Sequence, residues 1–390
     1  MITPANRTQL VNEYYFSQKL KQIEEMNSQG ASVINLGIGN PDLMPPISAL
    51  KVLSQKVMEP GVHGYQSYIG IPELRNAFSQ WYLNFYNIHL DANGEILPLL
   101  GSKEGIMHIS MAYLNPGDQV LIPNPGYPTY RSVSLLVGAE PVEYDLLPKN
   151  HWYPDFEQLE KLDLEKVKIM WVNYPHMPTG QPASMSLYNQ LVAFGKKHNI
   201  LICNDNPYSF ILNNQPLSIF SVPGAKDIAL ELNSLSKSHN MAGFRVGMVA
   251  GSREHISHVL KIKSNMDSGM YKPLQLAAAK AMESMQDWYD SMNTQYRERR
   301  KWVYQIFDLL GATYETSQTG LFIWAKIPKG FDGSFEFSDY FLQEAKVFIT
   351  PGAIFGSNGN QYARISLCST EHQLQMVLSR LVGVLQKVNK

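Results

Sequence analysis

The segment Ile228–Gly247 reads IALELNSLSKSHNMAGFRVG. Its first residues form an apolar run that predicts a buried β-strand. Two serines, Ser234 and Ser236, then precede Lys237 in a stretch rich in hydroxyl groups. A lysine that a core strand delivers into such a turn is partly desolvated, which lowers its pKa and makes its amine nucleophilic. An isolated lysine would more simply be a solvated surface charge, so the neighbouring residues decide between the two interpretations.

Arg245 follows eight residues after Lys237 and stands between Gly243 and Gly247. The guanidinium group is a rigid fork of N–H donors that matches the geometry of a phosphate. An amine and an anion clamp placed close together suit a phosphorylated aldehyde cofactor that is held as a Schiff base. The segment therefore indicates a cofactor site rather than a pair of surface charges.

The SxSK…GxRxG pattern of this segment resembles the signature of class I/II aminotransferases, which are pyridoxal phosphate (PLP) enzymes of fold type I in the aspartate aminotransferase superfamily. The resemblance covers nearly the whole chain from Tyr15 onward. The stretches GSKEG at 101–105 and DSGM at 267–270 are similar to the branch that contains LL-diaminopimelate, alanine and aspartate aminotransferases. The resemblance implies transamination between an L-amino acid and a 2-oxo acid, by double displacement through a Schiff base on Lys237.

Composition and charge agree with an enzyme of this kind. The 390 residues are enough for two domains, and 44% of them are hydrophobic and 17% charged, as in ordinary globular proteins. A net charge of −1 argues against a nucleic-acid partner. The two cysteines, Cys203 and Cys368, lie in apolar runs and are expected to be buried thiols in a reducing compartment. The start of the chain lacks the apolar core of a signal peptide, and no apolar run is long enough for a membrane span, so we expect a soluble cytoplasmic protein without a membrane partner.

Apolar runs alternate with helical patterns after Glu95, which predicts an α/β fold with a mostly parallel sheet sandwiched by helices. The expected strands of this sheet are Ile96–Leu100, Val120–Ile122, Val167–Val172, Ile200–Cys203 and Ile228–Leu232. From about residue 286 the pattern changes to a smaller α+β domain with a long charged helix, strands at Gly320–Ile327, Val347–Ile349 and Tyr362–Cys368, and a last helix over Glu371–Val388. We therefore predict a large PLP-binding domain over residues 46–285 and a small domain made of residues 1–45 and 286–390.

Candidate cofactor residues fall at the ends of the predicted strands, where parallel sheets bind ligands. Ser102 and Lys103 follow a strand and open a helix, whose free N–H groups bind anions. The resemblance implies that they hold the PLP phosphate, largely through main-chain N–H groups, together with Ser234, Ser236 and Arg245. It also implies that Tyr127, in the turn PGYP, stacks on the pyridine ring. Taken alone, Ser102 would be an ordinary helix cap and Tyr127 a surface tyrosine.

Asp205 follows the buried run Ile200–Cys203, where a carboxylate is costly unless a cation pairs with it. The protonated pyridine nitrogen of PLP is such a cation, and its charge makes the ring an electron sink. The resemblance implies that Tyr208, three residues later, donates a hydrogen bond to the phenolate oxygen of the cofactor. A turn with a solvated aspartate and tyrosine is the alternative, and we favour the cofactor site because the lysine motif is also present.

The stretch NYPHMPTG at 173–180 departs from the family pattern. Relatives usually carry an asparagine where Met177 stands, and that asparagine donates to the same phenolate oxygen, which a methionine cannot do. We expect weaker stabilisation of the phenolate, unless Asn173 partly replaces the missing donor. Met177 could instead shape the pocket for an apolar substrate side chain. Close relatives have cis prolines at such turns, so we predict cis bonds at Asn124–Pro125 and Met177–Pro178.

Three further residues take their expected roles from the resemblance. Arg364 lies on an apolar strand, and its planar fork would clamp the α-carboxylate of the substrate and draw the two domains together. Without the resemblance, it would be the solvent-facing residue of that strand. The backbone amide of Gly39, in the glycine-rich loop GIGNPD, would meet the same carboxylate. Tyr65 would reach across a homodimer interface to the cofactor phosphate of the neighbouring subunit.

Two other functions remain open. A PLP-dependent C–S β-lyase shares the fold and the lysine, and PLP-binding regulatory domains share both without catalysis. The regulatory alternative ranks low because such proteins carry an added DNA-binding domain, and this sequence begins with the enzyme-like segment. No cluster of cysteines and histidines has the spacing of a metal site, so we predict no metal.

Overall fold

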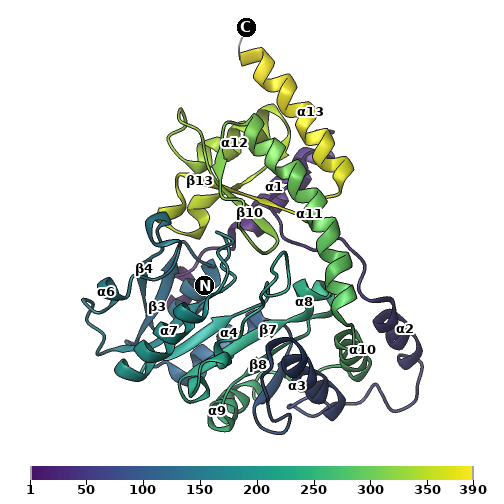
Figure 1. The fold of residues 1–390 in the computed structure, drawn as a ribbon, viewed down its shortest axis with the longest axis vertical. Helices are drawn as coiled ribbons and strands as arrows, with labels where there is room; N and C mark the ends of the chain where they lie inside the picture. The colour runs from purple at the N-terminus through teal and green to yellow at the C-terminus, as the bar shows by residue number, and fades with distance from the viewer. Residues whose placement is uncertain (1, 389–390) are drawn as a thin grey trace.

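The computed structural model describes residues 2–388, and its central feature is a seven-stranded sheet in the order β2-β8-β7-β6-β5-β3-β4 (Figure 1). The strands are β2 (Ile96–Leu99), β3 (Gln119–Asn124), β4 (Glu140–Asp145), β5 (Val167–Val172), β6 (Leu201–Asp205), β7 (Ala229–Ser234) and β8 (Gly247–Ala250). β8 runs antiparallel to its two neighbours, β2 and β7, and all other pairs of neighbouring strands in this sheet are parallel. The prediction of a mostly parallel sheet is therefore confirmed.

Helices cover both faces of this sheet, because alternate side chains of each central strand point to opposite faces. Ile169 and Trp171 of β5 belong to a core shared with α4 (Ser102–Tyr113), α5 (Pro128–Leu136) and α9 (Arg253–Lys263). Met170 and Val172 of the same strand belong to the core on the other face. That core includes side chains of α3 (Pro72–Tyr86), α7 (Met185–His198) and α10 (Lys272–Met282).

Two smaller sheets lie beside the large one, in the upper part of Figure 1. The strands β9 (Thr313–Tyr314), β10 (Phe322–Lys326), β12 (Thr350–Pro351) and β13 (Tyr362–Ser366) form an antiparallel sheet. The strand β1 (Ile34–Asn35) pairs in parallel with β11 (Val347–Phe348), so the N-terminal segment joins the C-terminal part of the chain. The division into domains at residues 46 and 285 stays a prediction, which this pairing supports.

Four helices accompany the smaller sheets: α1 (Tyr15–Ser28), α11 (Gln286–Leu309), α12 (Ser334–Glu344) and α13 (Glu371–Val388). Ile23 of α1 packs against Leu342 of α12 and Phe348 of β11. The long helix α11 runs from beside α10 up to the smaller sheets (Figure 1). None of the described helices is both long and apolar enough to cross a membrane.

Three differences from the predicted strands have physical reasons. β4 was not predicted because its sequence, EPVEYD, is polar, as an edge strand can be. β8 was not predicted because it is short and begins with Gly247, a residue type that is depleted in strands. The single strand expected over Val347–Ile349 is wrong, since β11 ends at Phe348 and the chain then changes sheets, with β12 beginning at Thr350.

Candidate active site

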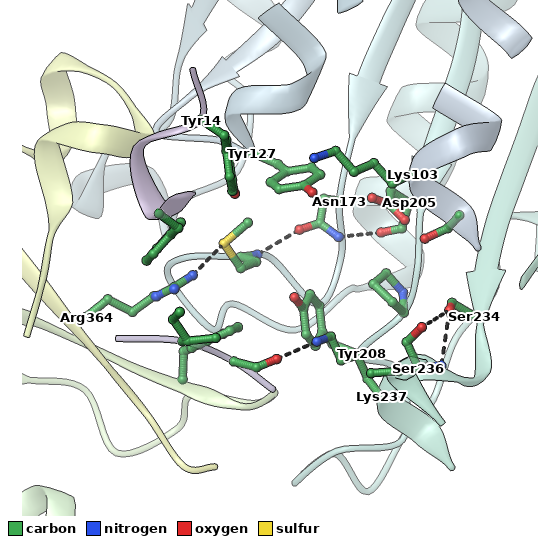
Figure 2. Close-up of a pocket in the computed structure, with 18 of the residues that line it drawn as sticks. Tyr14, Lys103, Tyr127, Asn173, Asp205, Tyr208, Ser234, Ser236, Lys237 and Arg364 are labelled. Atoms are coloured by element: carbon green, nitrogen blue, oxygen red, sulfur yellow. Dashed lines mark hydrogen bonds between the residues drawn. The ribbon is translucent and has the colours of Figure 1, made fainter. Parts of the chain in front are cut away.

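A cavity of about 650 Å³ opens at the carboxyl ends of the central strands, facing the smaller sheets. Every predicted site residue except Tyr65 lines it, and ten of the lining residues are labelled in Figure 2. These predicted residues are Gly39, Ser102, Lys103, Tyr127, Asn173, Met177, Asp205, Tyr208, Ser234, Ser236, Lys237, Arg245 and Arg364. The structure thus brings together side chains from segments that are far apart in the sequence.

Lys237 lies on the one-turn helix α8 (Leu235–Ser238), directly after β7. Ser234 caps this turn, because its Oγ accepts the backbone N–H of Ser236 at 3.1 Å and lies 2.9 Å from the Ser236 Oγ. The amine of Lys237 donates to the carbonyl oxygen of Gly39. Burial lowers the pKa of Lys237, and the nearby cations of Arg364 and Arg245 lower it further. The amine is therefore easier to deprotonate than that of a surface lysine.

An anion-binding surface lies beside Lys237. Helix α4 begins at Ser102, so the backbone N–H groups of its first turn point into the cavity without helical partners. Gly101, just before this helix, has φ +89°, and a Cβ placed on it would overlap the guanidinium of Arg245. Arg245 packs this closely against the start of α4 because residue 101 has no side chain. The hydroxyls of Ser234 and Ser236 face the same cavity, and the whole set matches a phosphate group.

Asp205 ends β6 and is 5% exposed. Its Oδ2 accepts a hydrogen bond from the Tyr130 hydroxyl at 3.0 Å, whereas its Oδ1 is buried without a protein partner. Burial raises the pKa of Asp205 to about 7. A cationic N–H placed against Oδ1 would complete its hydrogen bonding and lower this pKa again. The protonated ring nitrogen of PLP meets that requirement, so the residues present fit this cofactor.

Two tyrosines flank the space in front of Asp205 (Figure 2). Tyr127 precedes α5 and is largely buried, which keeps its pKa above the usual value. Burial also raises the pKa of Tyr208, so its hydroxyl stays protonated and can donate a hydrogen bond. The positions of both side chains are compatible with the roles expected from the sequence, which stay predictions.

The segment 173–178 contains the departure from the family pattern. The side-chain amide of Asn173 donates to the backbone oxygen of Asp205, and its Oδ1 accepts the backbone N–H of Met177 at 2.9 Å. Asn173 is thus engaged with the backbone on both sides. The bonds Asn124–Pro125 and Met177–Pro178 are cis, as predicted, and Tyr174–Pro175 is cis as well.

Arg364 on β13 is 4% exposed, so the alternative of a solvent-facing arginine is wrong. Its Nη1 donates to the Met177 sulfur at 3.1 Å and its Nη2 to the Gly37 carbonyl at 2.8 Å, while its Nε has no partner. The guanidinium lies 3.8 Å from the ring centroid of Phe322. Burial lowers the pKa of Arg364 to about 10. A buried arginine whose partners carry no charge is a strong candidate for binding an anion.

Several residues of the cavity were not assigned from the sequence. Tyr14 and Phe16 enter from the beginning of α1, and Phe322 and Phe355 come from the smaller sheets and their connection. Nothing in the local pattern of these aromatic residues distinguishes them from core residues. The side chain of Lys103 also lies in the cavity, with its Nζ 4.7 Å from the ring centroid of Tyr14. Burial lowers the pKa of Lys103, and the nearby Arg245 lowers it further.

Tyr65 is the predicted site residue that lies apart from the others. Its side chain is 92% exposed and does not line the cavity of its own chain. Its expected contact with a neighbouring subunit stays a prediction.

One group of possible metal ligands lies outside the cavity. Glu104, His108 and Asp267 have ligand atoms within 4.8 Å of one another. The Lys263 ammonium lies 2.9 Å from Asp267 and already balances its charge, so we assign no metal to this group.

Comparisons with known proteins agree with this geometry. Residues 31–381 match the family model described as aminotransferase class I and II. An LL-diaminopimelate aminotransferase from Natranaerobius thermophilus is 38% identical over 97% of this chain and 98% of its own length. Another, from Aquifex aeolicus, is 37% identical over the same shares.

Solved structures show the same fold. Substrate-bound BacF from Bacillus subtilis has a TM-score of 0.93 at 36% identity and covers 100% of this chain and 98% of its own. An aromatic aminotransferase from Pyrococcus horikoshii has a TM-score of 0.86 at 28% identity and covers 94% of this chain and 99% of its own. A Thermus thermophilus aspartate aminotransferase variant, at 22% identity, has a TM-score of 0.91, covers 98% of this chain and 100% of its own, and shows similarity of fold alone.

Proposed function

The chain belongs to the class I and II aminotransferases, which are PLP-dependent enzymes, and we propose which step of amino transfer each site residue performs. We also propose which amino acids the enzyme accepts. One observation carries the proposal. A buried lysine amine, a buried carboxylate with an unpaired oxygen and a buried arginine without a charged partner face one cavity. Transamination requires these three kinds of group: the amine moves the proton, the carboxylate pairs with the ring nitrogen of the cofactor, and the arginine binds the α-carboxylate of the substrate.

The cofactor would be held from several sides. The residues that would bind its phosphate all line the cavity: Ser102, Lys103, Ser234, Ser236 and Arg245, with Lys103 taking part through its backbone N–H. Asp205 would face the ring nitrogen, Tyr127 the face of the ring and Tyr208 its phenolate oxygen. Bound in this way, PLP supplies the electron sink that stabilises negative charge at the substrate's Cα.

The remaining steps belong to the side chains. Lys237 would attach the resting cofactor through its amine and, once a substrate displaces it, would take the proton from the substrate's Cα. The lowered pKa of Lys237 suits this task, because a general base must be neutral near the working pH. Arg364 and the backbone of Gly39 would bind the α-carboxylate and orient the Cα–H bond toward Lys237. A 2-oxo acid would then be converted by the reverse sequence in the second half of the double displacement.

For the amino donor, we propose an L-amino acid with a long side chain that ends in a charged group, as in LL-diaminopimelate. The Lys103 side chain supports this proposal, since its amine reaches the cavity near Tyr14, where it could meet a distal carboxylate. A second candidate is an aromatic donor. The rings of Tyr14, Phe16, Phe322 and Phe355 support that candidate by giving the cavity an aromatic lining.

A panel of donors separates the two candidates. Each L-amino acid is added singly to the PLP-loaded protein, and loss of the visible absorbance is followed together with formation of the matching 2-oxo acid. We expect LL-diaminopimelate to react at the lowest concentration, and Lys103→Met to raise its KM at least tenfold while leaving that for phenylalanine unchanged. Faster reaction with aromatic donors in both proteins would select the second candidate. Release of ammonia and pyruvate or thiol, without conversion of the cofactor, would instead indicate a C–S lyase.

We also propose that the enzyme is a homodimer in which Tyr65 of each subunit reaches the cofactor phosphate of the other. The 92% exposure of Tyr65 supports this arrangement, because a residue so exposed in one chain is available for contact with a second. The prediction of a cytoplasmic location is retained as compatible with an enzyme of amino-acid metabolism.

A further inference from the structure

The loop Gly37–Asp42 leads from β1 toward α2 (Ile47–Lys56) and contacts two cations of the cavity through its carbonyl groups. The Gly37 oxygen accepts from Arg364 Nη2 at 2.8 Å, and the Gly39 oxygen accepts from Lys237 Nζ. Both cations have few other polar partners. The position of this loop therefore influences where the guanidinium and the amine point.

The first half of the loop is held by the smaller sheets. The Gly37 oxygen also accepts from the Thr350 hydroxyl at 3.1 Å. A Cβ on Gly39 would overlap the ring of Phe322, so the backbone lies directly against β10. These contacts hold residues 37–39 on the side of the smaller sheets, whereas Asp42 at the other end of the loop is held by a different part of the chain.

The second half is held by an ion pair with α11. Asp42 accepts from Arg299 twice, with Oδ1 2.6 Å from Nη1 and Oδ2 2.8 Å from Nη2. Arg299 is 5% exposed, and its Nη1 also donates to the Leu367 carbonyl at 3.1 Å. Two parallel hydrogen bonds fix the orientation as well as the distance of an arginine–carboxylate pair. Arg299 thus connects the loop to the helix and to the residues that follow β13.

Arg299 and Arg364 are both buried arginines, but their charges are balanced differently. Arg299 has the carboxylate of Asp42 as a bidentate partner, whereas Arg364 has a thioether, a backbone carbonyl and an unpaired Nε. Arg299 is thus already neutralised and offers no free charge to a substrate carboxylate. Its contribution to the site must act through the loop that it holds.

We propose that Arg299 is a positioning residue for amino transfer: with Asp42 it holds the Gly37–Asp42 loop, and the loop in turn orients Arg364 for the substrate's α-carboxylate. This inference rests on the proposed function, in which Arg364 binds that carboxylate. Because the amino donor and the 2-oxo acid both carry an α-carboxylate, losing the ion pair weakens the binding of both. It affects the proton transfer by Lys237 less, because Lys237 lies on α8, which Ser234 caps independently of the loop.

The test compares Arg299→Met, Asp42→Asn and Arg299→Lys with the wild type. We expect the KM values for donor and 2-oxo acid to rise together about tenfold in Arg299→Met and Asp42→Asn, with kcat changed less than threefold. Arg299→Lys keeps the charge and should recover part of the loss. The matched control is Glu95→Gln, which removes the Lys226–Glu95 ion pair (2.7 Å) away from the cavity and should leave both KM values unchanged.

A binding measurement without turnover provides the second readout. Propionate, a carboxylate that cannot react, is titrated into the PLP-loaded proteins, and its Kd is read from the absorbance of the bound cofactor. We expect this Kd to rise in parallel with KM. Unchanged KM and Kd values together with a lower Tm would show that the pair is only structural and would overturn the inference.

Two further outcomes are also decisive. If Arg299→Met does not fold, Asp42→Asn and Arg299→Lys decide by the same criteria. The variant Arg364→Lys tests the proposed function separately. If it leaves the propionate Kd unchanged, the carboxylate assignment and the inference both fail. If it raises that Kd while the Arg299 and Asp42 variants do not, only the inference fails.

Discussion

The carboxyl group of Asp205 is the group of the site whose hydrogen bonding is most clearly incomplete without a cofactor. It is buried, one of its oxygens has no partner, and burial raises its pKa to about 7, well above the usual value for an aspartate. The folded protein without cofactor therefore holds this proton more tightly than the unfolded chain does. The stability of that cofactor-free form consequently falls between about pH 4 and pH 7, because over this range the carboxyl group ionises in the unfolded chain while it stays protonated in the folded one.

This loss of stability with rising pH predicts the effect of replacing Asp205 by a residue that cannot ionise. In cofactor-free protein, Asp205→Asn should raise the Tm relative to the wild type, by more at pH 8 than at pH 5. A pKa difference of this size corresponds to at most about 4 kcal/mol, or a few degrees in a chain of this length. Thermal unfolding at the two pH values measures it. With PLP bound the advantage of the variant should disappear, because the ring nitrogen then pairs with Asp205. An equal difference in Tm at both pH values would contradict the prediction.

Met177 gives a second prediction at this scale. Its thioether accepts from Arg364 and cannot donate to the phenolate oxygen of the cofactor, and the Asn173 amide is engaged with the backbone of Asp205. Met177→Asn should add a donor to the phenolate. The pH at which the visible absorbance of the bound cofactor titrates should fall by about one unit, since a hydrogen bond to a charged group contributes about 1.5 kcal/mol.

The control for this prediction is Met177→Leu, which keeps the apolar volume without adding a donor and should titrate like the wild type. A spectrophotometric pH titration of the three proteins gives the comparison. If Met177→Asn titrates at the same or a higher pH, the thioether has no such effect on the cofactor.

The connection between β7 and β8 places two of the site residues at the same end of the sheet. β7 and β8 are antiparallel neighbours, with Ser234 opposite Gly247. The chain between them must leave and re-enter the sheet at one end, which places Lys237 and Arg245 in the same loop at the cavity. A crossover to a parallel neighbour would have carried Arg245 to the opposite end of the sheet.

The start of α4 allows a prediction at this scale. Gly101 has φ +89°, and a Cβ there would meet the Arg245 guanidinium. Gly101→Ala should displace Arg245 and lower the PLP affinity at least tenfold, measured by equilibrium dialysis. Gly117→Ala is the matched control, because Gly117 has nearly the same φ, +87°, but open space around its Cβ position. Both variants place a side chain at a positive φ, which costs about 1–3 kcal/mol of backbone strain, and only the first should lose cofactor. Equal PLP affinities in the two variants would show that Arg245 does not need this close approach.

At the scale of the whole molecule, the cavity exists because two parts of the chain face each other. The central strands contribute Asp205 and Lys237, while β13 contributes Arg364 and α1 contributes aromatic side chains. The long helix α11 runs between the two parts (Figure 1). It carries Arg299, whose ion pair with Asp42 holds the loop that contacts both cations.

The proposed dimer leads to a prediction at the same scale. Light scattering should give about twice the chain mass of 44.1 kDa. If each site uses Tyr65 of the partner, chains with Tyr65→Ala alone and Lys237→Ala alone should be weakly active or inactive as homodimers. Mixed after unfolding and refolding, they should regain up to about a quarter of the wild-type activity, because heterodimers contain one complete site. No regain, in a mixture shown to contain heterodimers, would place Tyr65 outside the neighbouring site.

Much of the central sheet could be predicted from the sequence because its strands are buried on both faces. Such strands appear as continuous apolar runs, and Val167–Val172 was predicted with the bounds that β5 has. The edge strand β4 escaped prediction because one side of it is unpaired and its residues are polar. The positions of Lys237 and Asp205 at the cavity could be predicted in the same way, since both residues follow apolar runs.

Local sequence patterns were enough to predict which chemical groups the site contains and on which strand ends they lie, because strand burial and turn composition are local properties. The packing of separate elements, in contrast, buries Arg364 without a charged partner, brings Tyr14 and Phe322 into the cavity and pairs Arg299 with Asp42. These relations join residues hundreds of positions apart. They depend on how separate elements pack against one another, which no local pattern records.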